Sequence, residues 1–121
     1  MEAKDLIQQY YESLDQKDNR WQDLYAEDAL FTDASQVISA KGKEAVIQSF
    51  SNFLKGVEKV MVKEIIGEGE NLCAIISYDY VNPKGVKWNQ DVAEIWKVTD
   101  GKLAQLTIYF DLIAYRNFMR S

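Results

Sequence analysis

The chain has 121 residues, of which 47% are apolar and 27% charged, a composition typical of a single globular domain spanning residues 1–121. Nineteen acidic and fourteen basic residues leave a net charge of −5. This argues against nucleic-acid binding, which needs clustered Lys and Arg to neutralise phosphates. No apolar run approaches the roughly 20 residues of a membrane span, and residues 1–5 lack the basic flank of a secretory signal. With a single cysteine, Cys73, and hence no internal disulfide, we expect a cytoplasmic protein with neither nucleic-acid nor membrane partners.

The chain contains no histidine. This excludes Ser-His-Asp and Cys-His nucleophile pairs as well as His-based zinc or iron sites. Acid–base chemistry near neutral pH would therefore have to come from Asp, Glu, Tyr, Lys or the one Cys with a shifted pKa. Carboxylates in apolar surroundings are the leading candidates, and we expect neither a metal ion nor a cofactor.

The first half of the chain is predicted to be mainly helical. Apolar residues at helical spacing predict a first helix from Lys4 to Lys17, and a short second helix that holds Trp21, Leu24 and Tyr25. Two short strands are predicted next, followed by a third helix that opens after Gly42 and ends at Gly56. The strands are Ala29–Ala34 and Gln36–Ala40, and the helix buries Val46, Phe50, Phe53, Leu54 and Val57.

From Lys59 onward the apolar pattern has a period of two, which predicts strands joined by short turns. The four strands are Val60–Glu68, Leu72–Val81, Val86–Thr99 and Lys102–Phe110, and a terminal helix follows over Asp111–Met119. Helices followed by an antiparallel meander indicate an α+β fold. Because long strands twist, the sheet should curl around the helices and leave a concave inside where a ligand would bind.

Strand parity predicts which side chains point into this concave face. On the second strand of the meander the larger, more aromatic set includes Tyr78 and Tyr80, and on the third strand Trp88 and Trp96 carry Glu94 inward with them. A buried carboxylate is costly, so the pKa of Glu94 should rise or the group must find hydrogen-bond donors.

The last strand is apolar on both faces. We predict that its inner face carries Ala104, Leu106, Ile108 and Phe110, and that its outer face carries Leu103, Gln105, Thr107 and Tyr109. An outer face that mixes apolar with small polar groups would suit a subunit interface.

The order of these motifs resembles a known family. They are Ile7-Gln8-Gln9-Tyr10-Tyr11 with Leu14, the stretch from Leu24 to Asp33, the helix opening Gly42–Val46, and a meander ending in Tyr109-Phe110-Asp111. Together they resemble the NTF2-like superfamily and, within it, the SnoaL-like and ketosteroid-isomerase-like proteins. The resemblance implies a cone in which a bent antiparallel sheet wraps around helices, and a homodimer formed through the outer sheet face.

The isomerases of this family use three groups, which the resemblance carries over by position. Tyr10 matches the hydrogen-bonding tyrosine, Asp33 the general base, and Glu94 an acid kept protonated beside the tyrosine. In that mechanism Asp33 would abstract a proton next to a carbonyl while Tyr10 and Glu94 stabilise the enolate. The sequence departs from the family in having Ala34 where proline usually follows the base, and Glu where the second acid is usually Asp.

The partner implied is a small hydrophobic molecule bound inside the cone. The residues expected to line its site are Leu14, Phe50, Phe53, Ile76, Tyr78, Trp96, Leu106, Ile108 and Phe110.

Structural roles compete with these assignments. Tyr10 could be a core tyrosine, Asp33 a turn residue, and Glu94 an internal strut held by Tyr or Trp donors. The whole protein could then be a non-catalytic binding or dimerisation module. A polyketide cyclase or dehydratase would share the same cavity, although the missing histidine counts against a dehydratase with a His-Asp pair.

Overall fold

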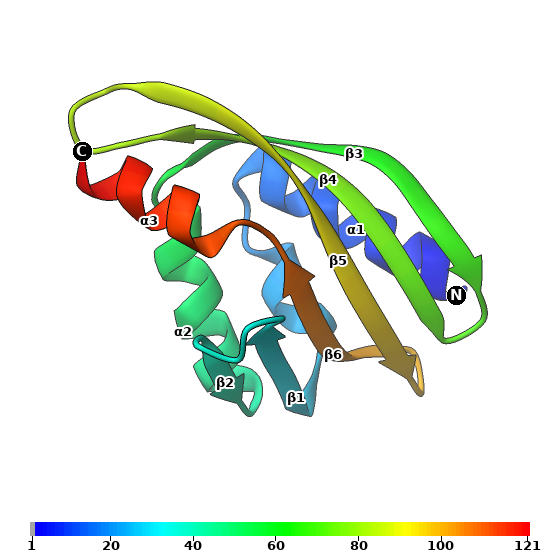
Figure 1. Cartoon of the computed structure of the whole chain (residues 1–121). Helices are drawn as coiled ribbons and strands as arrows, with labels where there is room; N and C mark the ends of the chain where they lie inside the picture. Colours follow the sequence, from blue (N-terminus) through cyan, green and yellow to red (C-terminus); the bar gives the residue numbers. More distant parts are fainter. Residues whose placement is uncertain (1) are drawn as a thin grey trace.

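A computed structural model describes residues 2–121 of the chain. Helices and strands follow one another in the order expected of an α+β protein (Figure 1). The helical elements of this part of the chain are α1 (Ala3–Gln16), the short 3₁₀ helix η1 (Arg20–Leu24), α2 (Lys43–Leu54) and α3 (Leu112–Arg120). The strands are β1 (Tyr25–Asp33), β2 (Ser39–Lys41), β3 (Val57–Glu68), β4 (Asn71–Val81), β5 (Lys87–Thr99) and β6 (Lys102–Tyr109). None of the helices within residues 2–121 combines the length and apolar character needed to cross a bilayer.

The strands form a single mixed sheet in the order β2-β1-β6-β5-β4-β3. Strands β3 to β6 pair antiparallel in sequence order, which confirms the predicted meander. Strand β1 pairs in parallel with β6 and antiparallel with β2. The sheet is strongly curved and does not close, because β2 and β3 lie at its opposite edges (Figure 1). This confirms the α+β cone.

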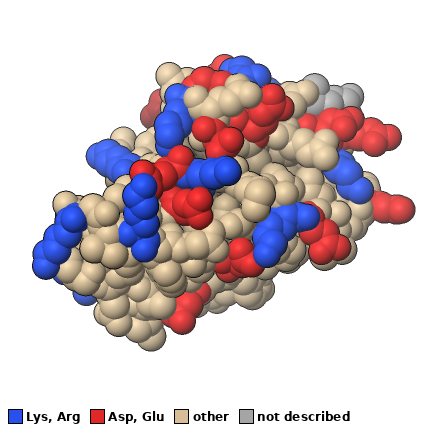
Figure 2. Space-filling view, turned by 90° about the horizontal axis from the view of Figure 1, so that it is seen from above, with Lys and Arg blue, Asp and Glu red and all other residues tan. Residues whose placement is uncertain are grey.

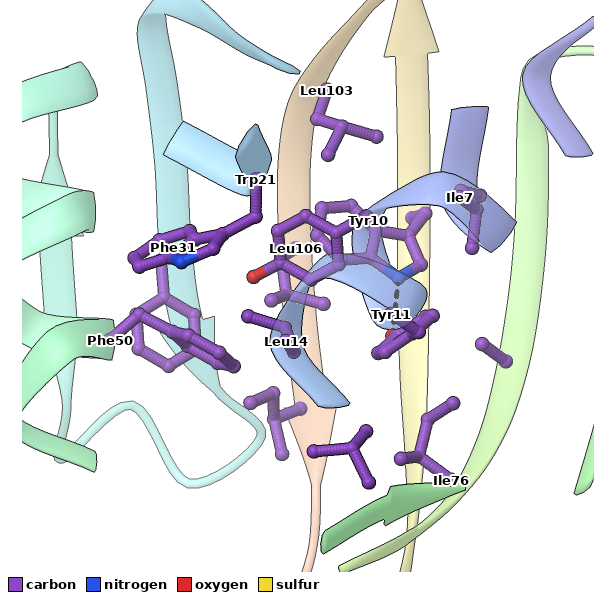
Figure 3. Close-up of a cluster of buried hydrophobic side chains, with 14 of the residues drawn as sticks. Ile7, Tyr10, Tyr11, Leu14, Trp21, Phe31, Phe50, Ile76, Leu103 and Leu106 are labelled. Atoms are coloured by element: carbon purple, nitrogen blue, oxygen red, sulfur yellow. Dashed lines mark hydrogen bonds between the residues drawn. The ribbon is translucent and has the colours of Figure 1, made fainter. Parts of the chain in front are cut away.

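The core lies between the concave face of the sheet and helices α1 and α2. Figure 3 shows Tyr10, Tyr11 and Leu14 of α1 beside Leu106 of β6, with Phe50 of α2 close by. The inner-face parity predicted for β4 and β5 is confirmed, since these residues are buried or, near the open end, half-buried. The inner-face side chains are Leu72, Ala74, Ile76, Tyr78, Tyr80, Trp88, Gln90, Val92, Glu94, Trp96 and Val98.

Two residues before the meander, Tyr25 and Val57, belong to other elements than the sequence predicted, and the strand predicted over Gln36–Ala40 is observed only over Ser39–Lys41. Tyr25 does not belong to the second helix but opens β1, because its backbone pairs with Leu103 of β6. Val57 does not belong to the third helix but opens β3 opposite Tyr80. Both residues are still buried, so apolar periodicity alone could not separate a helix end from a strand start.

The predicted inner face of β6 was wrong at its start. An irregularity between Lys97 and Val98 of β5 shifts the pairing with β6, so Leu103 points into the core and is fully buried, whereas Ala104 is half-buried. Leu106 and Ile108 beyond the irregularity are buried as predicted.

We expect Leu103→Ala to lower the free energy of unfolding by about 3 kcal/mol, because it leaves a cavity in a packed core. Ile113→Ala, at an α3 position that is 74% exposed, should change it by less than about 0.5 kcal/mol. Urea unfolding followed by far-UV circular dichroism measures both values. Equal effects of the two substitutions would contradict the inward orientation of Leu103.

Candidate functional site

A cavity of about 240 Å³ lies between α2, α3 and the inner face of the sheet. Its wall is mostly aromatic and aliphatic, with one carboxyl and few other polar groups. The lining residues are Phe31, Ile38, Ser49, Asn52, Phe53, Tyr78, Tyr80, Val92, Glu94, Ile108, Phe110 and Tyr115. Four larger depressions, of about 600, 560, 350 and 290 Å³, contain more charged and loop residues in their walls. We place the candidate site in the smaller cavity because its wall contains the buried acid Glu94 among aromatic side chains of the inner sheet face.

Glu94 is the acid in this wall. It lies on β5 with no exposed surface, and each of its carboxyl oxygens accepts a hydrogen bond from a tyrosine. Tyr11 of α1 donates to Oε1, and Tyr78 of β4 donates to Oε2 at 2.7 Å. Burial raises the pKa of Glu94 to about 7, against the opposing effect of the two donors. Glu94 therefore combines a structural tie between α1 and the sheet with a carboxyl that titrates near neutral pH.

Trp96 extends this hydrogen-bonded group. Its indole Nε1 donates to the Tyr11 hydroxyl at 2.8 Å, which is the bond dashed at Tyr11 in Figure 3. The chain of hydrogen bonds thus runs from Trp96 through Tyr11 to Glu94. Every buried side-chain polar atom in residues 2–121 has a partner, as a stable core requires.

Tyr10 is not the tyrosine that contacts Glu94. Its hydroxyl pairs with that of Tyr25, and its ring packs against Trp21 and Trp96 in the core (Figure 3). The contact that the family resemblance assigned to Tyr10 is made by Tyr11, because one residue along a helix turns the side chain by about 100°. Tyr10 does not line the cavity. This agrees with the alternative prediction that Tyr10 is a core tyrosine.

Asp33 lies outside the cavity wall and organises the turn that follows β1. Its carboxylate accepts hydrogen bonds from the backbone N–H groups of Ile38, at 2.7 Å, and Ser35, at 3.0 Å, and from the Ser35 hydroxyl. Burial alone would raise the pKa of Asp33, but these hydrogen bonds outweigh it and hold the pKa below its ordinary value. This geometry agrees with the alternative prediction that Asp33 is a turn residue. It does not bring Asp33 together with Glu94 in the cavity.

The residues expected to line the site divide into two groups. Phe53, Tyr78, Ile108 and Phe110 lie in the cavity wall. The others are buried deeper or elsewhere in the core and do not line the cavity: Leu14, Phe50, Ile76, Trp96 and Leu106. The sequence prediction therefore placed the cavity too deep, because aromatic side chains from α1 and β5 fill the narrow end of the cone.

Several lining residues were missed. Tyr80 and Val92 share strand parity with Tyr78 and Glu94, so the signal for them was present in the sequence. Ser49, Asn52 and Tyr115 carried no such signal, because the position of α2 and α3 over the cavity depends on tertiary packing. Within residues 2–121 no three Asp, Glu or Cys side chains come together as a potential metal site.

Comparison with known proteins defines the family. Residues 7–106 match the family described as the SnoaL-like domain. The chain belongs to the SnoaL-like domain family. This confirms the NTF2-like and SnoaL-like resemblance. No curated protein matches the chain.

Solved structures of similar proteins share the fold. TerC, co-crystallized with polyporic acid, is 14% identical with a TM-score of 0.84 and 97% of each chain covered. A proposed SnoaL-like polyketide cyclase from a Jannaschia species is 15% identical with a TM-score of 0.82, covering 97% of this chain and 90% of that one. An NTF2-like protein of unknown function from Burkholderia pseudomallei is 14% identical with a TM-score of 0.83, covering 97% of this chain and 96% of that one. At these identities the similarity establishes the architecture and leaves the activity to be argued from the site.

The burial of Glu94 predicts how stability depends on pH. Its pKa rises from 4.5 in the unfolded chain to about 7 in the folded one, so the folded chain binds more protons between these values. The free energy of unfolding should therefore fall by about 3 kcal/mol as the pH rises through this window. Glu94→Gln should remove this fall. Glu70→Gln, in the exposed β3–β4 turn, should keep it.

Urea unfolding at a series of pH values between mildly acidic and mildly alkaline measures this dependence for the three proteins. The slope of the unfolding free energy against pH is diagnostic even if Glu94→Gln lowers stability at every pH. A wild-type slope in Glu94→Gln would show that another group is responsible.

Proposed function

We propose that this protein binds a small, largely apolar molecule with one carbonyl or hydroxyl group in the cavity between α2, α3 and the inner sheet face. The observation that carries this proposal is the hydrogen-bonded pair of Glu94 and Tyr78 in a wall that is otherwise mostly aromatic and aliphatic. Ligand sites commonly combine apolar walls with a few convergent polar groups. The co-crystallization of TerC with polyporic acid supports small organic molecules as ligands of this fold.

The cavity also indicates the size and charge of the ligand. Its volume of about 240 Å³ lies below the roughly 300 Å³ at which cavities begin to hold drug-sized molecules, so we expect one or two rings. Among the residues that the structure describes, no Lys or Arg lines the cavity, and its carboxyl is Glu94. An anionic ligand would meet this acid with no compensating positive charge, so a neutral molecule fits best.

Proton transfer next to a carbonyl is the second candidate function, favoured by the near-neutral pKa of Glu94. With a β,γ-unsaturated ketone, ionised Glu94 would take a proton from the carbon between the carbonyl and the double bond, leaving a dienolate. It would return the proton to the γ-carbon, so that the double bond moves into conjugation with the carbonyl. Asp33 was the base in the hypothesis drawn from the family, but it is engaged in its own turn. In this proposal Glu94 takes that role. The alternative is binding without turnover.

We expect β-tetralone, a two-ring ketone, to perturb the NMR signals of Phe53, Tyr80 and Tyr115 because these rings form the cavity wall. If Glu94 is an acid–base catalyst, the wild type should speed exchange of the ketone's α-hydrogens in deuterated water. The exchange rate with Glu94→Gln should then be at least tenfold lower than with the wild type and approach the rate in buffer alone. Glu70→Gln, at an exposed turn, serves as the matched control and should exchange at the wild-type rate.

Binding without exchange would favour the non-catalytic module. Absence of any perturbation at millimolar ketone would contradict the proposed ligand class.

We further propose that the protein is a homodimer that pairs through the outer face of the sheet. Met61, Ile66, Ile95 and Tyr109 are each at least 42% exposed, and strand register places them on the side away from Glu94. Clustered exposed apolar side chains are typical of protein interfaces. On the face seen from above, Figure 2 shows acidic and basic side chains interspersed without an extended area of one sign, so like charges need not oppose pairing.

We expect sedimentation equilibrium to give the mass of two chains for the wild type and of one chain for Ile95→Lys, because a lysine would be buried without a partner in the interface. Ile113→Lys, also at an exposed isoleucine but on α3, should remain dimeric. A monomeric wild type would contradict the proposed dimer.

A further inference from the structure

We infer that Tyr78 is the residue that recognises the polar atom of the ligand, and that the protonation state of Glu94 decides whether Tyr78 offers that atom a hydrogen-bond donor or acceptor. The ligand part of this inference rests on the proposed function. The change in hydrogen bonding is a property of the free protein and can be tested separately.

The argument begins with the fixed direction of the bond at Tyr11. An indole N–H can only donate, so the Tyr11 hydroxyl accepts from Trp96 and directs its single hydrogen to Oε1 of Glu94. A proton on Oε1 would force Tyr11 to accept twice and leave its own hydrogen without a partner in the core. An unsatisfied buried donor costs roughly 1–3 kcal/mol. Oε1 therefore stays an acceptor whether or not Glu94 is ionised.

The bond on the other side of Glu94 is free to reverse. Within residues 2–121, the side-chain hydrogen bond made by the Tyr78 hydroxyl is the one to Oε2, at 2.7 Å. When Glu94 is neutral, its proton resides on Oε2 and is donated to Tyr78. Tyr78 is as buried as Tyr11 but lies in the cavity wall, so its own hydrogen, unlike that of Tyr11, can turn towards the polar atom of a ligand in the cavity. When Glu94 is ionised, Tyr78 donates to Oε2 and presents only its lone pairs to the cavity.

The surroundings leave Glu94 as the group that changes charge near neutral pH. The titratable groups that face it or lie nearby all have raised pKa values, chiefly through burial, and remain uncharged in this range. They are Tyr10 and Tyr11 of α1, Tyr25 of β1, Tyr78 and Tyr80 of β4, and Tyr115 of α3. Cys73, also on β4, lies on the opposite face of the sheet. The α2 and β6 residues in the cavity wall are not titratable.

The consequence is a change in ligand preference with pH. A carbonyl, which only accepts, should bind the state in which Glu94 is neutral and Tyr78 donates. Its affinity should then fall by up to about tenfold for each pH unit above the titration of Glu94, and its binding should in turn stabilise neutral Glu94.

The reversal is tested on the free protein by NMR of tyrosines isotope-labelled at the ring carbon that bears the hydroxyl. We expect the Tyr78 signal to shift as the pH passes through the titration of Glu94, and the Tyr11 signal to shift much less. Tyr78→Phe and Tyr11→Phe assign the two signals. Glu94→Gln should abolish the Tyr78 shift. A larger shift at Tyr11 than at Tyr78, or no shift at either, would overturn the inference.

A second variant tests the cause of the asymmetry. Trp96→Phe removes the indole donor, so Tyr11 should become able to reverse and its signal should shift with that of Tyr78. If this variant does not fold, the wild-type comparison of Tyr11 with Tyr78 still decides the question.

The ligand arm compares β-tetralone with tetralin, which lacks the carbonyl, one pH unit below and one above the titration of Glu94. We expect the affinity of the wild type for the ketone to fall at the higher pH, that for tetralin to stay constant, and Tyr78→Phe to lose the pH dependence for the ketone. Ketone binding without pH dependence would show that Tyr78 does not recognise the ligand. No ketone binding despite a Tyr78 shift would overturn the proposed function and leave only the reversal.

Discussion

The burial of one carboxyl group, that of Glu94, constrains the rest of this structure. A carboxyl with no exposed surface is costly unless both oxygens are satisfied, and here the donors come from α1 on one side and β4 on the other. Residues 11 and 94 are far apart in sequence, so their hydrogen bond ties the first helix to the centre of the meander. The position of α1 on the concave face, and with it the closed narrow end of the cone, follows from this requirement as well as from apolar packing.

The same requirement explains why the cavity lies where it does. Tyr10, Trp21 and Trp96 fill the space beside Tyr11 with edge-to-face ring contacts. On the Tyr78 side the rings of Phe53, Tyr80 and Tyr115 come from α2, β4 and α3 and form part of the cavity wall. Glu94 therefore lies at the boundary between the packed core and the cavity, with Oε1 bonded to Tyr11 of the core and Oε2 bonded to Tyr78 of the cavity wall.

Much of this arrangement could be predicted from the sequence, and the failures have physical causes. Alternation of side chains identified the inner faces of β4 and β5 and the burial of Glu94, because strand parity is a strict geometric rule. The choice of Tyr10 over Tyr11 failed because both are buried on the same helix and only the tertiary fold decides which hydroxyl reaches β5. The parallel pairing of β1 with β6 and the shifted register at Leu103 depend on long-range contacts that leave no local pattern.

Asp33 shows why position within a family motif is weaker than chemistry at the site. An acid that already accepts two backbone hydrogen bonds and a hydroxyl bond is stabilised in its ionised form, which makes it a poor proton acceptor. Glu94 has the opposite environment: burial favours its neutral form, and its hydrogen-bond donors within residues 2–121 are two tyrosine hydroxyls. Because Tyr11 is committed to Trp96, the two oxygens of this one carboxyl cannot be equivalent. Glu94 can thus hold the fold together through Oε1 while Oε2 remains free to exchange a proton beside the cavity, and the structural and chemical roles considered for it need not exclude each other.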